Sequence, residues 1–310
     1  MSVLLITHPA CLEHFMGPHH PESPDRLRAI LAALDAPEFA GLIRAEAPEA
    51  SHEQLCRVHP AAHVDAILAI RPAPGQGVAL DADTIMSAGS ATAALRAAGA
   101  ACAAVDAVLS GQADAAFAAI RPPGHHAEPD RAMGFCLFNN AAIAALHARA
   151  QWGLSRVAVL DFDVHHGNGT QAMFYADKDL FYASSHQSPC YPGTGHVREQ
   201  GVAGNIVNAP LPPGADGAAF RAAWARVILP TLEKFAPELI IVSAGFDAHR
   251  ADPLAQLRVE TADYAWLTQE ILRVADSHAG GRIVSVLEGG YDLAALAEAT
   301  AAHIRVLINR

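Results

Sequence analysis

The sequence predicts an α/β protein built on a single, mostly parallel β-sheet with helices on both faces. The first observation behind this prediction is that short apolar runs, typical of strands buried on both faces, alternate with longer stretches that carry apolar residues at helical spacing. The second is size: 310 residues, 52% hydrophobic and 17% charged, can bury a large core. No linker-like stretch or internal repeat divides the chain, so we expect one domain over residues 1–310.

The individual elements follow from local composition. The expected strands are five short runs rich in β-branched and other apolar residues: Val3–Thr7, Ala115–Ile120, Val157–Phe162, Leu239–Ser243 and Ile283–Leu287. The expected helices are four longer stretches: Ser87–Ser110, Ala218–Phe235, Thr261–Ala275 and Leu293–Ile308. The first helix is alanine-rich, the second follows a Pro-Gly turn, and the last two continue the helical spacing of apolar residues. This alternation of strands and helices favours a parallel sheet.

Charge and cysteine content narrow the class of protein. The 21 basic and 32 acidic residues leave a net charge of −11, which argues against a nucleic-acid binder that neutralises phosphates and mildly favours cationic partners. The five cysteines are odd in number, widely spaced and never arranged as Cys-x-x-Cys: Cys11, Cys56, Cys102, Cys136 and Cys190. This usage suits a reducing compartment rather than a disulfide framework or a thiolate zinc site.

We expect no targeting or membrane-spanning segment. Met1–Thr7 is apolar, but His8 and Pro9 end the run too early for a signal peptide. The longest apolar region, Ala88–Ala119, is interrupted by charged residues such as Arg96 and does not suit a membrane span. A cytoplasmic protein that contacts neither nucleic acid nor membrane is therefore the expectation.

Four segments rich in chemically functional side chains each follow a predicted strand: Arg121–His126, Asp161–Asn168, Gly245–His249 and Glu288–Tyr291. In open parallel sheets, ligands bind beyond the carboxyl ends of the strands. The four segments therefore point to one shared pocket.

The second of these segments indicates a metal site. Strand residues alternate between faces, so Asp161, Asp163 and His165 are expected to point the same way. Two carboxylates and an imidazole at the end of a buried strand need a cation, whereas a solvated acidic turn is the plainer alternative. With Asp247, Asp163 and His165 form a three-ligand oxygen and nitrogen set of the kind found at catalytic zinc. Iron, cobalt or manganese would suit the same ligands.

The other segments supply groups for proton transfer. His125 and His126 follow the rigid turn Arg121–Gly124, and a histidine beside a metal site can accept and donate protons near neutral pH. Tyr291 follows two glycines that let the backbone approach closely, so its phenol can donate to a developing oxyanion.

Six motifs, in this order, resemble the zinc-dependent histone deacetylase family: Arg-Pro-Pro-Gly-His-His (121–126), Gly-Phe-Cys-Leu-Phe-Asn-Asn (134–140), Asp161–Gly169, Pro-Gly-Thr-Gly (192–195), Ser-Ala-Gly-Phe-Asp-Ala-His (243–249) and Glu-Gly-Gly-Tyr (288–291). The resemblance extends over nearly the whole chain, from His20-Pro21-Glu22-Ser23-Pro24 to the end, and is to the class II branch with its bacterial amidohydrolases and acetylpolyamine amidohydrolases. It implies the arginase–deacetylase fold, in agreement with the strand pattern.

The resemblance also implies a set of catalytic roles. It assigns the zinc ligands to Asp163, His165 and Asp247. His126 becomes the general base and acid, and His125, next to Asp161, its electrostatic partner. Tyr291 completes the oxyanion site.

Further binding roles rest on the resemblance alone. It assigns Phe135 and Tyr191 to the aromatic walls of the acyl-lysine tunnel and Gly290 to a backbone acceptor for the substrate amide. It assigns Gly134 and Leu254 to substrate binding as well. A structural potassium site, built largely from backbone carbonyls, falls on Asp161, Asp163, His165, Ser184 and Ser185. A second, weaker monovalent site falls on Phe174, Asp177 and Leu180.

Asn168 departs from the pattern of many class I relatives, which carry an aspartate there. Asparagine can orient an imidazole but cannot supply the charge that would hold it protonated, so His126 is expected to be the more readily neutral histidine. Arg26 matches an interior arginine of the family, although a surface charge at a helix start explains it equally well.

Three alternatives remain open for the function. An acetylpolyamine deacetylase shares the chemistry, but its members carry an acidic gatekeeper after Asp-Pro, where this chain has Leu254. A binuclear manganese ureohydrolase needs further aspartates, and His249 stands where a second carboxylate is required. A catalytically inactive acyl-lysine binder would not need the intact metal ligands and Tyr291 that this chain has. The expected substrate is an acyl-lysine protein or peptide, or a small N-acyl amine, and homo-oligomerisation stays open.

Overall fold

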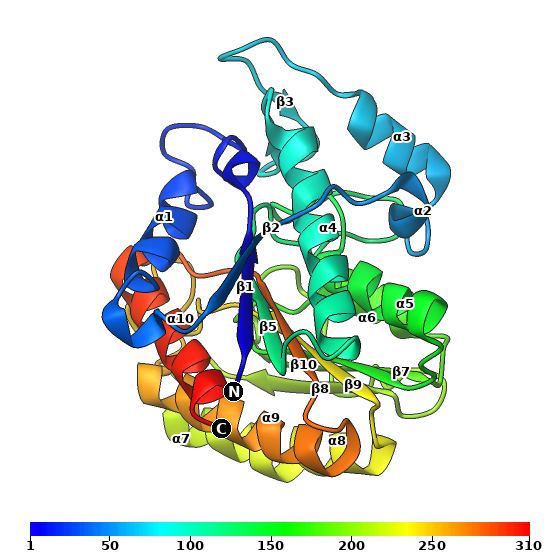
Figure 1. Ribbon diagram of the computed structural model, residues 1–310, viewed down its shortest axis with the longest axis vertical. Helices are drawn as coiled ribbons and strands as arrows, with labels where there is room; N and C mark the ends of the chain where they lie inside the picture. The colour runs from blue at the N-terminus through cyan, green and yellow to red at the C-terminus, as the bar shows by residue number, and fades with distance from the viewer.

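An eight-stranded, entirely parallel sheet forms the centre of the protein, as the computed structural model of residues 1–310 shows (Figure 1). Its strands lie side by side in the order β2 (Ile43–Glu46), β1 (Val3–Thr7), β5 (Ala115–Ala118), β10 (Ile283–Leu287), β9 (Leu239–Ala244), β6 (Val157–Asp161), β7 (Leu180–Gln187) and β8 (Ile206–Leu211). A separate antiparallel pair consists of β3 (Val78–Ala79) and β4 (Ile85–Met86). The predicted fold class, a mostly parallel sheet of the arginase–deacetylase type, is confirmed.

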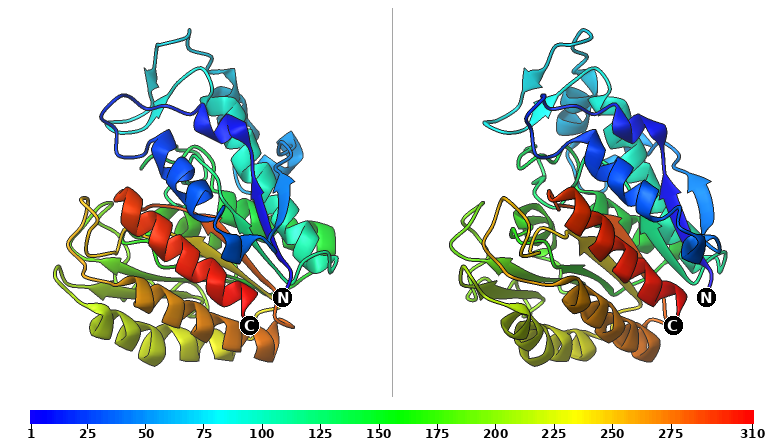
Figure 2. Two further views of the ribbon diagram at one scale, coloured as in Figure 1. Left: turned by 60° about the vertical axis from the view of Figure 1, so that its left-hand side comes forward. Right: turned by 90° about the vertical axis from the view of Figure 1, so that its left-hand side faces the viewer.

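Helices cover both faces of the sheet (Figure 2). On one face lie α4 (Ser90–Leu109), α5 (Asn140–Trp152) and α6 (Asn168–Phe174). On the other lie α1 (Pro24–Ala33), α7 (Gly217–Ala223), α8 (Leu229–Phe235), α9 (Thr261–His278) and α10 (Leu293–Ile308). The short helices α2 (His52–Leu55) and α3 (Ala61–Ala69) lie with β3 and β4 at one end of the molecule (Figure 1). The 3-10 turns Pro9–Leu12 and Pro37–Phe39 follow β1 and α1.

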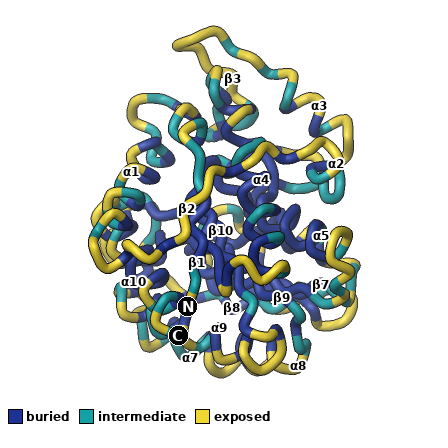
Figure 3. The backbone as a smooth tube through the Cα atoms, in the orientation of Figure 1, coloured by how far each residue is buried: buried dark blue, intermediate teal, exposed yellow.

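The core lies between the sheet and these two helical layers (Figure 3). Every residue of β5, β6, β9 and β10 is buried, as continuous apolar runs in a doubly covered sheet predict. By length and composition α4 is apolar enough to cross a membrane, yet 67% of its most apolar window is buried inside the protein. Alanine and other small residues along α4 let it pack closely over the sheet.

Three strands of the central sheet have no counterpart in the sequence prediction, each for a local reason, and the short pair β3 and β4 was not predicted either. All four residues of β2 are exposed, so this edge strand lacks an apolar pattern. The second half of β7, Ser184–Gln187, is polar although buried. The other edge strand, β8, contains Pro210, and proline is tolerated in a sheet mainly at its edges.

The helix predicted over Ala218–Phe235 is present but irregular. A π-helical segment, Trp224–Ile228, separates α7 from α8, and Leu229 donates its N–H to the Trp224 carbonyl. Pro230 lies at the start of α8 and has no N–H for the Arg226 carbonyl, which interrupts the regular ladder. Helices α1, α2, α3, α5 and α6 were not predicted; α2 and α6 are only 4 and 7 residues long, and the apolar residues of α5 do not stand out among its alanines.

Candidate active site

Loops from four strands meet at the carboxyl edge of the sheet, as the sequence predicts. They follow β5, β6, β9 and β10, which are neighbours in the sheet. A cavity of about 200 Å³ opens between them. Its lining residues are Asp83, Pro123, His125, His126, Gly134, Phe135, His165, Tyr191, Leu254, Gly289 and Tyr291. Asp83, Pro123 and Gly289 were not predicted as site residues.

The three predicted metal ligands form one buried cluster, and one of them, His165, lines this cavity. The Nδ1 atom of His165 is 3.1 Å from Asp163 Oδ1 and 3.1 Å from Asp247 Oδ2. All three side chains are buried, and their ligand atoms lie within 4.8 Å of one another. Backbone donors orient both carboxylates: Asp163 accepts the N–H groups of Gly289 (2.8 Å) and His165 (2.9 Å), and Asp247 accepts the N–H of Val164 (2.7 Å).

Glycine is required beside these ligands. A Cβ atom at Gly245 would collide with the carboxylate of Asp163, and one at Gly289 would collide with both carboxylates.

Burial and the nearby charge of Asp163 raise the pKa of Asp247 to about 7. Two buried carboxylates that repel each other around one imidazole fit a divalent cation, which would neutralise them.

The histidine pair lies beside this cluster, and its members differ in charge. His125 Nδ1 is 2.9 Å from Asp161 Oδ2, which also accepts the hydroxyl of Tyr182 (3.0 Å). Burial alone would lower the pKa of His125, but the charges of Asp163 and Asp161 outweigh it and raise this pKa to about 10. His125 is therefore an imidazolium at neutral pH.

His126 has a different partner and stays neutral. Its Nδ1 is 2.8 Å from Asn168 Oδ1, while Asn168 Nδ2 donates to Glu128 Oε1 (2.8 Å). Because the amide oxygen must accept, Nδ1 of His126 carries the hydrogen and Nε2 keeps its lone pair. Burial, followed by the charge of His125, lowers the pKa of His126 well below its ordinary value. This histidine is suited to accept a proton.

Tyr291 lies across the cavity from the histidines and stays protonated. Burial raises the pKa of its phenol well above the ordinary value. The backbone N–H of Tyr291 donates to Asp252 Oδ2 (2.7 Å), and the guanidinium of Arg26 lies 4.9 Å from the centre of its ring. The hydroxyl is therefore available as a hydrogen-bond donor inside the cavity.

Arg26 is fully buried, so the alternative of a surface charge at a helix start is wrong. Its Nε donates to the carbonyl of Gly290 (2.6 Å), and Nη2 donates to the carbonyl of Glu288. The Gly290 carbonyl, predicted as an acceptor for the substrate amide, thus already accepts from Arg26, and Gly290 does not line the cavity.

Two buried acids complete the support and were not found from the sequence. Glu288 Oε2 accepts the N–H groups of Gly124 (2.7 Å) and His125 (3.2 Å), and Oε1 accepts the Ser243 hydroxyl (3.0 Å). Burial raises the pKa of Glu288 to about 7. Glu22 pairs with the fully buried Arg121, which ties the start of the histidine loop to the N-terminal segment. Glu288 could have been recognised as a site residue from its position directly after an apolar strand.

Aromatic rings form the walls of the cavity. The Phe135 ring lies 6.0 Å from that of Tyr291 and 4.6 Å from that of His20, in edge-on contacts. The Tyr191 ring lies 5.0 Å from that of His126 and is 39% exposed, so it reaches the cavity mouth. Gly134 and Leu254 also line the cavity, as predicted.

The first predicted potassium site has free backbone acceptors. Asp161 and Ser184 are paired in register across β6 and β7. The carbonyl oxygens of Asp163 and His165 accept no backbone hydrogen bond although both residues are buried. Ser185 lies beside them in β7, and its hydroxyl accepts the indole N–H of Trp224 (2.9 Å). Unpaired buried carbonyls fit a monovalent cation.

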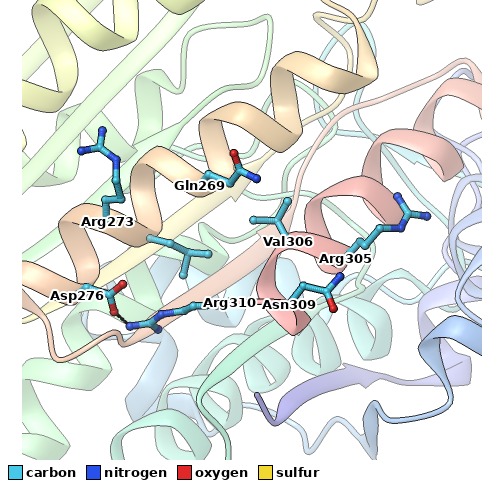
Figure 4. A pocket seen from close by; sticks show the side chains of 8 residues that line it. Gln269, Arg273, Asp276, Arg305, Val306, Asn309 and Arg310 are labelled. Carbon is cyan, nitrogen blue, oxygen red and sulfur yellow. Dashed lines mark ion pairs between the residues drawn. The ribbon is translucent and has the colours of Figure 1, made fainter.

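A larger cavity, about 450 Å³, lies between α9 and α10, remote from the catalytic edge (Figure 4). Its three arginines are each paired with a carboxylate: Arg273 with Glu270, Arg305 with Glu38, and Arg310 with Asp276. Because its charges are already neutralised, it offers no evident anion site.

The fold and site together define a class of protein: an arginase–deacetylase fold with a carboxylate–histidine cluster that could hold a metal ion, a histidine pair and a phenol at the carboxyl edge of the sheet. The histone deacetylase domain matches residues 20–307, and the chain belongs to that family of deacetylases.

Relatives of this chain are also named as deacetylases or amidohydrolases. A histone deacetylase-like amidohydrolase of Pseudomonas aeruginosa is 43% identical over 303 residues, which cover 91% of this chain and 79% of that protein. A probable deacetylase of Archaeoglobus fulgidus is 38% identical over 295 residues, covering 93% of this chain and 81% of its own. The crystal structure of the HDA15 HD domain superposes with a TM-score of 0.93 at 38% identity, covering all of this chain and 88% of that one.

Proposed function

We propose that the protein is a zinc-dependent amidohydrolase that removes acetyl or related acyl groups from the ε-amine of lysine. The observation that carries this proposal is that one cavity is lined by His165 of the Asp163–His165–Asp247 cluster, by a neutral His126 and by a protonated Tyr291. A divalent metal bound by this cluster would polarise an amide carbonyl and make a water molecule more acidic. We further propose that residues 1–310 act as one catalytic domain.

The protein's own groups have distinct roles in this proposal. His126 Nε2 accepts a proton from the attacking water and later delivers it to the leaving amine. His125, held positive by Asp161, stabilises negative charge that develops nearby. The Tyr291 hydroxyl donates to the former carbonyl oxygen as it becomes an oxyanion. Asn168 acts through His126 and is a positioning residue.

The shape of the cavity supports an acyl-lysine substrate. Phe135, Tyr191 and Gly134 all line the cavity, and aromatic walls suit an alkyl chain. Leu254 places an apolar side chain where polyamine-selective relatives carry an acid, so we propose a preference for peptides over acetylpolyamines. We place the protein in the cytoplasm, acting on peptides or proteins rather than on nucleic acid or membranes.

We expect kcat/KM to be higher for an acetyl-lysine peptide than for N-acetylputrescine, with hydrolysis inhibited by a hydroxamate. Leu254→Glu should narrow the difference, because a carboxylate at the mouth attracts the free ammonium of the polyamine. Leu293→Glu, at an exposed leucine in α10, is the matched control and should leave the difference in kcat/KM unchanged. A wild-type preference for the polyamine would contradict the peptide assignment, and absence of turnover on both would favour an acyl-lysine binder.

A further inference from the structure

The turn between α6 and β7 holds three backbone carbonyls around one side-chain nitrogen. The oxygens of Phe174, Asp177 and Leu180 lie 3.0, 3.1 and 2.9 Å from Nδ2 of Asn205, which precedes β8. These are the residues that the family resemblance assigns to a second monovalent cation. An amide nitrogen has only two hydrogens, so three acceptors around it form an arrangement closer to a cation cage than to ordinary amide pairing.

Two of the three carbonyls of this turn also accept a backbone hydrogen bond. The Phe174 oxygen also accepts the N–H of Asp177 (3.2 Å), and the Asp177 oxygen accepts the N–H of Leu180 (3.1 Å). A carbonyl oxygen has two lone pairs, so the Phe174 and Asp177 oxygens each have one left, and the Asn205 amide lies within hydrogen-bond distance of it. The side chain of Asp177 is engaged as well, since its Oδ2 accepts from Arg149 (2.5 Å).

Asn205 is itself fixed in this orientation. Its side chain belongs to a residue only 3% exposed, and its Oδ1 accepts the N–H of Ala203 (3.2 Å). Its backbone carbonyl accepts the N–H of Tyr182 in β7 (2.9 Å). Because Oδ1 faces a donor, Nδ2 must face the three carbonyls. Reversing the amide would place oxygen against oxygen and leave a buried N–H pointing at Ala203 N–H.

We propose that the side-chain amide of Asn205 takes the place of a monovalent cation in this turn, so that the protein has no second potassium site. The two N–H groups of Nδ2 occupy the space between the same carbonyls and donate to them without an ion. The unpaired carbonyls of Asp163 and His165 remain the only predicted monovalent site with free acceptors. The consequence is that the turn between α6 and β7 is held together without a bound ion.

Thallium(I), which replaces potassium and scatters anomalously, tests this directly in crystals of the wild-type protein. We expect no thallium peak among the carbonyls of Phe174, Asp177 and Leu180. A peak there would overturn the proposal, whether or not hydrolysis is observed. The proposal is thus decided separately from the proposed function, because the readout is ion occupancy rather than activity.

Asn205→Ser provides the converse test, because it removes the amide and opens the space between the carbonyls. Melting temperatures are measured in KCl and in choline chloride at equal ionic strength. We expect Asn205→Ser to gain a larger potassium-dependent increase in Tm than wild type, by about 2 °C or more, together with a new thallium peak in the turn. Asn309→Ser, at an exposed residue after α10, should respond like wild type. An Asn205→Ser protein with the wild-type potassium response and no new peak would contradict the proposal, and if this variant fails to fold, the wild-type crystals decide alone.

Discussion

We expect His126→Ala to lower kcat for an acetyl-lysine peptide by about 10²–10⁴-fold, the range that a positioned acid–base group contributes. The structure leaves Nε2 of His126 with a free lone pair in the cavity, and neighbouring His125 is an imidazolium that cannot accept a proton. KM should change little, because the proton moves only as the reaction proceeds. Steady-state kinetics at saturating peptide measure this. Loss of less than about tenfold in kcat, well short of that range, would mean that His126 is not the proton carrier.

Variants at Asn168 separate proton transfer from orientation. Asn168→Ala removes only the orienting oxygen and should cost about 10–100-fold, less than His126→Ala. In Asn168→Asp a carboxylate would stabilise the His126 imidazolium and raise the pKa of His126. A base must be deprotonated to act, so the acidic limb of the pH–rate profile should move to higher pH. An unmoved limb in Asn168→Asp would show that the limb does not report His126.

Tyr291→Phe is expected to lower kcat by about 10²–10³-fold, equivalent to about 2.7–4 kcal/mol, the usual effect of deleting one oxyanion donor. Amide hydrolysis builds negative charge on the former carbonyl oxygen, and the phenol, kept protonated by burial, donates to it. The interaction strengthens in the transition state, so the loss should fall mainly on kcat. Because phenylalanine keeps the ring that packs near Arg26 and Phe135, metal content and Tm should barely change.

A more reactive acyl group provides the internal control for Tyr291→Phe. A trifluoroacetyl-lysine peptide has a carbonyl that needs less stabilisation, so the variant should lose less activity on it than on acetyl-lysine. Tyr175→Phe, at an exposed tyrosine, should behave as wild type on both substrates. A kcat for Tyr291→Phe within about threefold of wild type on acetyl-lysine, far below the usual donor effect, would leave this residue as a lid.

The fold was largely predictable because its central strands are buried on both faces and therefore appear as unbroken apolar runs. Strand β7 was not, since Ser184–Gln187 are polar where they approach the site. Burial of such side chains depends on partners from other elements, as in the hydrogen bond that the indole N–H of Trp224 donates to Ser185 Oγ (2.9 Å). A pattern along the chain does not record those partners.

The site was predictable to the same extent. Residues grouped in short motifs at strand ends, such as Asp163, His165 and Tyr291, could be placed together because parallel strands share one carboxyl edge. Residues whose partners lie far away in the sequence could not be placed in this way. Arg26 meets Gly290 across 264 positions, and Asn205 fills a turn formed 25 to 31 positions earlier. Neither partner is visible without the fold.

The central claim, that hydrolysis depends on a metal held by Asp163, His165 and Asp247, is tested most directly by removing the metal and restoring it. The protein is dialysed against a strong chelator, its metal content is measured, and hydrolysis of an acetyl-lysine peptide is followed before and after addition of zinc or cobalt. Asp247→Ala, which removes a ligand carried on a loop, is measured in parallel with circular dichroism as the check on folding. We expect metal-free protein to be inactive and zinc or cobalt to restore it, while Asp247→Ala stays folded, retains less than about one equivalent of metal and is not restored. Full activity in protein verified to be free of metal would contradict the account.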